Sequence, residues 1–515
     1  MTSENHNAAV HFVDRHAGGP VGGKAAFVEG FGGGREMTYD QLADQTARVA
    51  GMLARHGLRQ EDRAAMLVLD QLEFPVIFWG ALKAGVVPVP LNTLLGREVY
   101  DLILTDSRAR ALFVSAELFD VVAPLLEGHP HIEKVFVIGG EVPAGTLDFA
   151  TEFAASEPRT PLPVKPDECA FWLYSSGSTG QPKGVRHVHA NLQATADTYG
   201  AEVLGIEEGD RIFSAAKLFF AYGLGNGMTF PMSVGATTVL YNGRPTPDSV
   251  SEVLERTRPT IFCGVPTLYA AMLHKMQDEG RVPDAPLRRC ISAGEALPEE
   301  VGKGWARLWG VDILDGVGST ELLHIFLSNA PGDVVYGTSG KPVPGYDVRL
   351  VDEAGNDVED GEVGELIVRG HSAAESYWNQ RHKSRETFEG HWTRTGDKYI
   401  RNPEGRYVYC GRTDDMFKVS GIWVSPFEVE QALISHPSVL EAAVIARRDE
   451  EGLEKPMAYV VLKDACAKDG VDVTLKEHVK ERIGKWKYPR WIEVVPELPK
   501  TATGKIQRFK LREVA

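Results

Sequence analysis

The sequence has 515 residues, of which 43% are hydrophobic and 24% are charged, and its formal net charge is -16. This composition is typical of a folded globular protein and argues against extensive disorder. The length exceeds that of a single compact core, so we expect a large body with at least one further domain. The negative charge argues against nonspecific binding to nucleic acid or anionic lipid, although a local basic patch can still hold a phosphorylated ligand.

The five cysteines are scattered without a CxxC pair, so neither a disulfide framework nor a zinc site is expected. The first ten residues lack a basic segment followed by an apolar one, and no later stretch has the apolar length needed to span a bilayer. We therefore expect a cytoplasmic protein that acts on small molecules, without a nucleic-acid or membrane partner. A homodimer is left open, since dimers are the commonest closed assemblies.

The first third of the chain alternates between helix and strand patterns. Residues 38–57 predict an amphipathic helix, which Thr38 and Gln41 begin as a capping box and Gly57 ends. An apolar strand at 64–69, a helix at 74–84 and a strand at 86–89 follow, with further strands expected at 111–114 and 135–138. This alternation favours parallel α/β layers.

A second α/β set follows a proline-rich connector at 158–166. The run 171–174 predicts a strand that ends in a glycine-rich loop, and further short strands are expected at 237–240, 260–263, 289–292 and 312–314. Ligands commonly bind beyond the carboxyl ends of parallel strands, so these ends predict a binding crevice.

The chain makes a fresh start after Gly411, with strands expected at 442–446 and 459–462 and a helix at 475–483. We therefore predict an α/β protein in two parts. Residues 1–411 form a large body of layered α/β subdomains, and residues 412–515 form a small mobile α+β domain.

The most informative segment runs from Tyr174 to Gly184, with the sequence YSSGSTGQPKG. Glycines permit close backbone approach, and hydroxyls with Lys183 can contact phosphate oxygens, so a phosphate loop is predicted. The spacing is not a Walker A motif, because no Gly-Lys-Ser/Thr sequence follows Gly177 at the required distance. A flexible surface turn would explain the glycines but not the lysine after Pro182.

This loop resembles the signature of the adenylate-forming superfamily, which includes acyl- and aryl-CoA synthetases, luciferases and peptide-synthetase adenylation domains. Further segments resemble its other signatures in the same order along nearly the whole chain: SAGEA at 292–296, DGVGSTE at 315–321, TGD at 395–397, GRTDDMFKVSG at 411–421 and PKTATGK at 499–505. The resemblance implies ATP, Mg²⁺ and coenzyme A as reactants and cofactor.

The resemblance implies a role for each signature in activating a carboxylate, which needs cations where two anions meet. Lys505 would bridge the carboxylate and the α-phosphate, and Glu321, with Thr179 or Thr320 nearby, would hold the metal. A solvated tail lysine is the alternative for Lys505. The ATP phosphates would be contacted by Ser175, Ser176, Gly177, Ser178, Thr179, Gly180 and Lys183.

The resemblance also assigns the nucleoside and the moving domain. Asp397 and Arg412 would bind the ribose hydroxyls, as an acceptor and donor pair suits a diol. Asp414 would be the hinge about which the carboxyl-terminal domain rotates between half-reactions, and Gly421 would line the thiol tunnel. Asp414 as an exposed turn residue is the alternative. The adenine would be bordered by Gly294, Glu295, Ala296, Asp315, Gly316 and Val317.

Segments 217–226 and 321–326 resemble benzoate-CoA ligases and their hydroxybenzoate and aminobenzoate relatives. The likeness implies a flat ring against Tyr222 and near His324, with small residues leaving a slot. Ordinary core packing is the alternative for both side chains. The full set implied to surround the aryl acid is Ala221, Tyr222, Ala293, Gly318, His324, Ile325 and Lys418.

We therefore expect an aryl-CoA ligase that converts a benzoate-type acid (benzoate, 2-aminobenzoate or a hydroxybenzoate) and ATP to an aryl-AMP and pyrophosphate, and then transfers the aryl group to coenzyme A with release of AMP. One alternative is a stand-alone adenylating enzyme that loads a carrier protein. A nonenzymatic nucleotide-binding regulator is a second alternative, but it would not need Lys505.

Overall fold

The computed structural model describes residues 5–176, 181–419, 422–463, 470–500 and 506–514, and it divides into two compact units. Unit 1 comprises residues 1–336, 340–347 and 368–393, and unit 2 comprises 337–339, 348–367 and 394–515. Within the described residues, no helix is long and apolar enough to cross a membrane.

A nine-stranded sheet forms the centre of unit 1, in the order β16-β15-β14-β13-β12-β10-β11-β1-β2. Its strands are β1 (Ala25–Glu29), β2 (Glu36–Thr38), β10 (Arg211–Ser214), β11 (Thr237–Leu240), β12 (Ile261–Gly264), β13 (Arg289–Ser292), β14 (Ile313–Gly318), β15 (Ile325–Ser328) and β16 (Lys341–Pro342). The six strands from β14 to β1 are mutually parallel, and β2, β15 and β16 add antiparallel edges.

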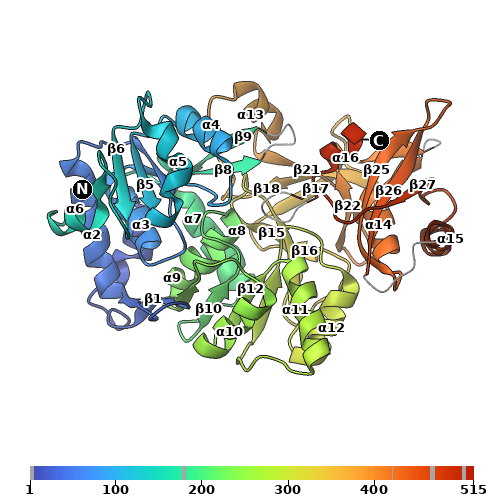
Figure 1. Cartoon of the computed structure of the whole chain (residues 1–515), viewed down its shortest axis with the longest axis horizontal. Helices are drawn as coiled ribbons and strands as arrows, with labels where there is room; N and C mark the ends of the chain where they lie inside the picture. Colours follow the sequence, from blue (N-terminus) through green and yellow to red (C-terminus); the bar gives the residue numbers. More distant parts are fainter. Residues whose placement is uncertain (1–4, 177–180, 420–421, 464–469, 501–505, 515) are drawn as a thin grey trace. The chain divides into compact units, whose positions relative to one another are not determined.

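Burial on both faces explains why the central strands are short apolar runs. All four residues of β11 and of β12 are buried, as parallel sheets require. The helices α10 (Pro247–Thr257), α11 (Pro266–Glu279) and α12 (Glu299–Trp309) lie together beside this sheet (Figure 1). Phe262, Tyr269 and Trp305 pack between them, with the Tyr269 and Trp305 ring centroids 4.7 Å apart.

The parallel register aligns the carboxyl ends of these strands, as the sequence predicted. Gly264 of β12 lies opposite Ser292 of β13, which lies opposite Asp315 of β14. The four predicted strands at 237–240, 260–263, 289–292 and 312–314 are confirmed, although β14 continues to Gly318 because it pairs with β15. Residues from several strands thus reach one edge of the sheet.

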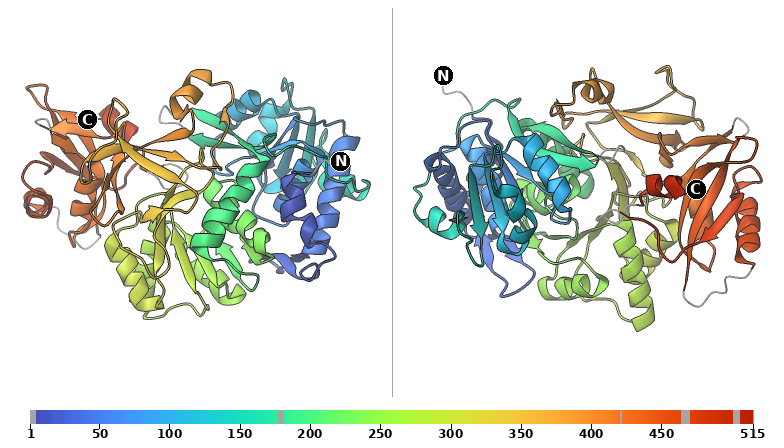
Figure 2. Two further views of the ribbon diagram at one scale, coloured as in Figure 1. Left: turned by 180° about the vertical axis from the view of Figure 1, so that it is seen from behind. Right: turned by 45° about the horizontal axis from the view of Figure 1, so that its top comes forward.

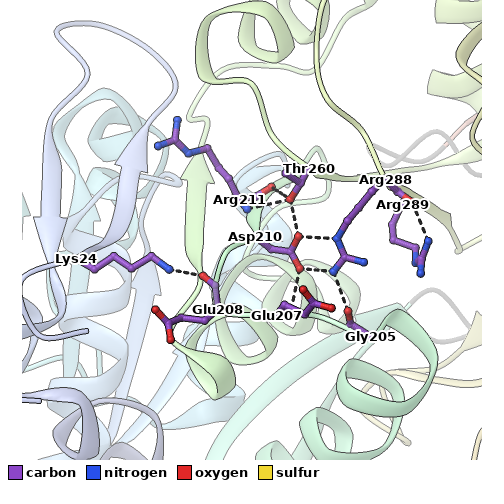
Figure 3. Close-up of polar contacts among 9 residues, drawn as sticks. All are labelled: Lys24, Gly205, Glu207, Glu208, Asp210, Arg211, Thr260, Arg288 and Arg289. Atoms are coloured by element: carbon purple, nitrogen blue, oxygen red, sulfur yellow. Dashed lines mark hydrogen bonds and ion pairs between the residues drawn. The ribbon is translucent and has the colours of Figure 1, made fainter. Parts of the chain in front are cut away.

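The opposite, amino edge of the same sheet is held by an ion pair between a buried aspartate and a half-buried arginine (Figure 3). Asp210, only 4% exposed, accepts hydrogen bonds from Arg288 Nε at 2.7 Å, from Arg288 Nη2, and from the Thr260 hydroxyl at 2.7 Å. The backbone amide of Glu207 donates to the same carboxylate at 2.8 Å. These contacts tie together the starts of β10, β12 and β13.

A second sheet of unit 1 has the order β4-β3-β5-β6-β7, with all of its pairs parallel. Its strands are β3 (Arg63–Leu67), β4 (Val87–Pro90), β5 (Ala111–Ser115), β6 (Lys134–Ile138) and β7 (Leu147–Asp148). The helices that accompany it are α2 (Tyr39–Arg55), α3 (Glu73–Ala84), α4 (Arg97–Ser107), α5 (Phe119–Leu126) and α6 (Phe149–Ala154). These blue to cyan segments gather in one part of unit 1 in both views of Figure 2.

The capping box predicted for the first long helix is present. The Gln41 amide donates to the Thr38 hydroxyl at 3.2 Å, and the Thr38 amide donates to the Gln41 side chain at 2.9 Å. The remaining elements of unit 1 are α1 (Ala8–Phe12), the 3-10 helices η1 (Asp14–His16) and η2 (Ala116–Leu118), β8 (Cys169–Ser176), β9 (Pro182–Val188), α7 (His189–Thr195), the π-helix η3 (Ala196–Leu204), α8 (Ala221–Leu224), the π-helix η4 (Gly225–Thr229), α9 (Phe230–Val234), β19 (Ser376–Tyr377), α13 (Arg381–Thr387) and β20 (Phe388–Glu389).

Unit 2 contains a three-stranded sheet of β25 (Val439–Arg448), β26 (Glu454–Leu462) and β27 (Trp491–Val494). Val429, Leu433 and Leu475 lie in the core between this sheet and two helices, which are α14 (Pro426–Ile434) and α15 (Val471–Ile483). The strands expected at 442–446 and 459–462 and the helix expected at 475–483 are confirmed within these bounds. The other elements are β17 (Asp347–Val351), β18 (Val363–Arg369), β21 (Trp392–Arg401), β22 (Tyr407–Arg412), β23 (Phe417–Val419), β24 (Ile422–Val424) and α16 (Arg508–Val514).

Candidate functional site

The predicted phosphate loop joins the two strands of a hairpin. Strands β8 and β9 pair antiparallel, with Ser175 opposite Lys183 and Ser176 opposite Pro182. Lys183 therefore stands at the start of β9, directly after the loop. Of the predicted phosphate contacts, Gly177, Ser178, Thr179 and Gly180 lie outside the described residues, as does the side chain of Ser176.

The loop that carries Thr320 and Glu321 lies against this hairpin. His187 of β9 donates from Nε2 to the Thr320 carbonyl oxygen at 2.9 Å. Burial lowers the pKa of His187 to about 4, which favours the neutral ring, and its other nitrogen, Nδ1, lies 3.2 Å from Asn191 Oδ1. The Tyr377 hydroxyl donates to Glu321 Oε1 at 2.7 Å, and the Lys183 ammonium lies 5.1 Å from the centroid of the Tyr377 ring.

This arrangement brings the predicted phosphate lysine and the predicted metal ligand to a common neighbour. The Glu321 side chain is half-buried, and its carboxylate is a hard oxygen donor, which suits Mg²⁺. Of the predicted donors, Glu321 and Thr320 lie within the described residues, and the chemistry of the Glu321 carboxylate suits the ion. Thr179 lies outside the described residues.

The residues predicted to border the adenine lie at the carboxyl edge of the sheet. Gly294, Glu295 and Ala296 form the loop after β13, and the amide of Leu297 at its end donates to Asp315 Oδ2 at 3.4 Å. Gly294 adopts φ +98°, a conformation that favours glycine. This loop is thereby brought to Asp315, and Gly316 and Val317 continue along β14.

Asp315 itself is buried, with 6% of its surface exposed, and Oδ1 has no hydrogen-bond partner among the described residues. Burial raises the pKa of this carboxyl to about 8, against the smaller opposing effects of the Leu297 amide and the Ser292 hydroxyl. Oδ1 is therefore a buried polar atom without a partner among the described residues, at the edge where the adenine is predicted to lie.

Two of the residues predicted to surround the aryl acid contact each other directly. The rings of Tyr222 and His324 are stacked, with centroids 5.7 Å apart and planes inclined by 27°. The Tyr222 hydroxyl donates to the carbonyl oxygens of Gly264 and Ile291 at 3.1 Å each, so it is bound to the ends of β12 and β13. The ring of Tyr222 therefore has a fixed place at the carboxyl edge.

His324 lies in an aromatic environment that the sequence did not reveal. Its ring centroid is 4.6 Å from that of Phe230 and 5.0 Å from that of Tyr199. Burial lowers its pKa to about 3, and neither ring nitrogen forms an aligned hydrogen bond among the described residues. A neutral imidazole with unmatched nitrogens can still bind a polar ligand group.

Small residues make room for this histidine. A Cβ atom on Gly318 would lie 2.4 Å from the His324 carbonyl oxygen, because Gly318 pairs with Ile325 across the β14–β15 hairpin. A Cβ on Gly225, the first residue of η4, would lie 2.5 Å from His324 Cδ2. Leu323, just before the histidine, adopts φ +64°, a left-handed conformation that is costly for a side chain of this size.

The segment that leads to Ala221 and Tyr222 is held by buried charges. The Lys217 ammonium donates to the carbonyl oxygens of Tyr241 and Gly243, the latter at 2.8 Å. The buried Asp70 carboxylate accepts from the Leu218 amide at 3.2 Å. Ala293, at the end of β13, and Ile325 are buried at the same edge.

The predicted ribose residues meet within unit 2. Asp397 of β21 lies opposite Arg412 of β22, and Arg412 Nη1 donates to Asp397 Oδ1 at 3.0 Å. A Cβ on Gly396 would lie 2.9 Å from Arg412 Nη2, so the glycine permits this approach. Asp414 is exposed in the following turn, and Lys418 lies in β23, its side chain outside the described set. Gly421 and Lys505 lie outside the described residues.

A family model described as AMP-binding enzyme matches residues 13–378, and one described as AMP-binding enzyme C-terminal domain matches residues 428–505. The chain belongs to the AMP-binding enzyme family. It is therefore an adenylate-forming enzyme with a large amino-terminal domain and a small carboxyl-terminal domain, as the sequence predicted.

Similar members of this family are known over their full length. A 4-hydroxybenzoate–CoA/benzoate–CoA ligase of Rhodopseudomonas palustris is 52% identical over 100% of this chain and 95% of its own. A benzoate–CoA ligase of Thauera aromatica is 54% identical over 99% of this chain and 96% of its own. The crystal structure of the anthranilate CoA ligase AuaEII with anthranoyl-AMP has a TM-score of 0.93 and 42% identity, covering 99% of this chain and 97% of that one.

Sequence reasoning missed three residues that organise this site: His187, Gly225 and Tyr377. The contact from His187 to Thr320 spans 133 positions and that from Tyr377 to Glu321 spans 56. Gly225 lies inside the segment that resembles benzoate-CoA ligases, but it must lack a side chain because the His324 ring lies beside it. No local pattern marks these partners, because tertiary packing creates them.

Proposed function

We propose that the protein is an AMP-forming aryl-CoA ligase whose acid is a benzoate. Aryl acid and ATP form an aryl-AMP with release of pyrophosphate, and the thiol of coenzyme A then displaces AMP to form the aryl thioester. The observation that carries the proposal is the pair of stacked rings, Tyr222 and His324, at the carboxyl edge of a sheet in an AMP-binding enzyme. The full-length likeness to benzoate–CoA ligases supports the same acid and acceptor.

In this proposal the ring of the acid lies against Tyr222 and beside His324. The other residues around the ring of the acid are Ala221, Ala293, Gly318 and Ile325. The stacked, buried and neutral His324 favours an uncharged ring substituent over an anionic one, since a neutral imidazole offers no compensating charge. The two relatives above 50% identity are named for benzoate and 4-hydroxybenzoate, so we expect these acids to be better substrates than 2-aminobenzoate.

The nucleotide roles are proposed from the placements described above. Lys183 and the hydroxyls of Ser175 and its neighbours bind the phosphates, and Glu321 holds the Mg²⁺, which supplies charge neutralisation at the phosphates when bound. Asp397 and Arg412 bind the ribose. The remaining nucleotide contacts proposed are Ser176, Gly177, Ser178, Thr179, Gly180, Gly294, Glu295, Ala296, Asp315, Gly316, Val317 and Thr320.

The two half-reactions need different groups at one carbonyl carbon. Lys505 stabilises the charge that moves from the carboxylate to the α-phosphate, and Lys418 contacts the acid in the other arrangement. We propose that residues 412–515 rotate about Asp414 between the two, which brings Gly421 to the thiol path. The two compact units are separated by how densely their residues pack. The proposed boundary at residue 412 marks instead the point about which the carboxyl-terminal part rotates.

Cytoplasmic placement and a homodimer are further parts of the proposal. ATP and coenzyme A are both cytoplasmic reactants, which supports the first. Dimers are the commonest closed assemblies, which supports the second. Sedimentation of the purified protein with and without ATP tests the assembly.

The test of function is a panel of acids with ATP, Mg²⁺ and coenzyme A, in which AMP and thioester are measured together. Benzoate and 4-hydroxybenzoate should give equal amounts of AMP and aryl-CoA, while cinnamates and medium-chain acids should give little of either. Accumulation of aryl-AMP without thioester would reject coenzyme A as acceptor and point to loading of a carrier protein.

A further inference from the structure

Tyr377 belongs to a short strand that pairs with the second strand of the phosphate-loop hairpin. In β19, Ser376 lies opposite Arg186 and Tyr377 opposite Val185 of β9. The Trp378 amide extends this pairing by donating to the Gly184 carbonyl oxygen at 2.8 Å. Tyr377 is 5% exposed, so its position is set by backbone pairing and burial rather than by the site it faces.

The hydroxyl of Tyr377 fixes the carboxylate of Glu321. It donates to Oε1 at 2.7 Å, a length typical of a strong hydroxyl–carboxylate hydrogen bond. The Ala374 amide donates to the Glu321 carbonyl oxygen at 2.8 Å, so the segment that contains Tyr377 holds both the backbone and the side chain of Glu321. Orientation of the carboxylate in this way leaves Oε2 for a cation.

The ring of Tyr377 faces the other charged residue of the proposed phosphate site. The Lys183 ammonium lies 5.1 Å from its centroid, within the range of a cation–π interaction. The same side chain thus contacts a proposed phosphate cation with its face and a proposed metal ligand with its hydroxyl. These two residues are distant in sequence and have opposite charge, and Tyr377 is a neighbour common to both.

We propose that Tyr377 is a positioning residue for adenylation, which sets the affinity of the site for the divalent cation–ATP complex by holding Glu321 and Lys183 in register. The inference rests on the proposed nucleotide roles of these two residues. Since ligands of a metal depend on their hydrogen-bond partners for orientation, loss of such a partner typically costs 10- to 100-fold in metal affinity.

Tyr377→Phe tests this proposal, because it removes the hydroxyl and keeps the ring. The matched control is Tyr336→Phe. The Tyr336 hydroxyl also donates to a carboxylate at 2.7 Å, that of Asp312, but it does so at the amino end of β14, away from Glu321. Both variants therefore lose one hydrogen bond of the same type and length.

The first measurement is the binding of Mn²⁺ by electron paramagnetic resonance, with the α,β-methylene analogue of ATP and no aryl acid. Tyr377→Phe should weaken Mn²⁺ binding about tenfold or more, while Tyr336→Phe should leave it within about twofold. The second is benzoate-dependent exchange of pyrophosphate into ATP, in which Tyr377→Phe should raise the Mg²⁺ concentration for half-maximal rate and leave the KM for benzoate unchanged.

Wild-type Mn²⁺ affinity in Tyr377→Phe, or an equal loss in both variants, would overturn the proposal. If the proposed function is wrong, the wild-type protein will show no exchange of pyrophosphate into ATP with any aryl acid. The Mn²⁺ comparison needs no acid, so it would still decide the role of Tyr377.

Discussion

Gly225→Ala should damage use of the aryl acid by displacing His324. The added Cβ would lie 2.5 Å from His324 Cδ2, 2.8 Å from Nε2 and 2.9 Å from Phe230 Cζ, whereas carbon atoms in contact are normally about 3.5–4.0 Å apart. The His324 ring must therefore move by about 1 Å. The ring also packs against Tyr199, Phe230 and Tyr222, so its displacement disturbs the stacking on Tyr222.

A displacement of this size in a site is expected to lower kcat/KM for benzoate by about 10- to 100-fold, the cost of an ångström of misplacement. The assay is pyrophosphate exchange at varied benzoate and saturating ATP, and again at varied ATP. The KM for benzoate should rise, while the KM for ATP should stay within about twofold, since overpacking here is local. Unfolding in urea should show a loss of about 1–3 kcal/mol at most.

The matched control is Gly227→Ala, two residues along the same π-helix. Its Cβ would lie 3.0 Å from Leu218 Cδ2, the end of a flexible side chain, and 3.6 Å from Ser214 Cβ. It changes backbone freedom in the same way without touching His324. Equal kinetic effects of the two variants, or wild-type kinetics in Gly225→Ala, would refute the assignment of His324 to the acid site.

Three further predictions concern other parts of the molecule. Lys505→Ala should abolish aryl-AMP formation but leave transfer from supplied aryl-AMP to coenzyme A largely intact, and equal loss of both half-reactions in stopped assays would contradict domain rotation. Asp210→Asn should lower the free energy of unfolding by about 1–3 kcal/mol, because the half-buried Arg288 loses its carboxylate partner, and unchanged urea midpoints would contradict this. His324→Gln should make the free energy of unfolding less dependent on pH below about 6.5. Burial lowers the His324 pKa to about 3, so the wild-type protein loses about 1.4 kcal/mol of stability per pH unit as pH falls below the unfolded pKa of about 6.5. Identical slopes in urea unfolding between pH 7 and pH 5 would contradict it.

Much of the fold could be predicted because local chemistry and tertiary structure agree. Thr38 and Gln41 mark a helix start by their own hydrogen bonds, and the helix begins there. The strand ending near Ser292 was identified by its apolar run, and parallel pairing then placed its end beside Asp315 without further information. The hairpin that carries the predicted phosphate loop could be placed because an apolar run precedes its glycines.

The second layer of the site could not be predicted, because its signals are not local. Tyr377 and His187 lie in strands whose sequence gives no sign of which loop they will face, and both reach the loop of Glu321 through pairing of β9 with its neighbours. The positive φ of Leu323 is likewise hidden, since leucine has no preference for that conformation. The β14–β15 hairpin imposes it.

The raised pKa of Asp315 gives a last test, which separates a structural acid from a ligand-binding one. Since burial raises this pKa from 3.8 to about 8, the folded state holds the proton more tightly than the unfolded state. The contribution of Asp315 to stability is therefore complete below pH 3.8 and is lost as pH rises toward 8, at about 1.4 kcal/mol per pH unit.

Asp315→Asn keeps an acceptor for the Leu297 amide and removes the charge. The variant should gain stability over the wild type as pH rises from 5 to 8, by about 3–4 kcal/mol in urea unfolding, as the slope over three pH units requires. If ionised Asp315 accepts a hydrogen bond from adenine, ATP should lower the Asp315 pKa, because such a bond favours the charged form. The stability difference between Asp315→Asn and the wild type should then be smaller with ATP than without it. If the stability difference between the variant and the wild type changes with neither pH nor ATP, the carboxyl is already ionised and hydrogen-bonded in the folded protein. Adenine would then bind elsewhere.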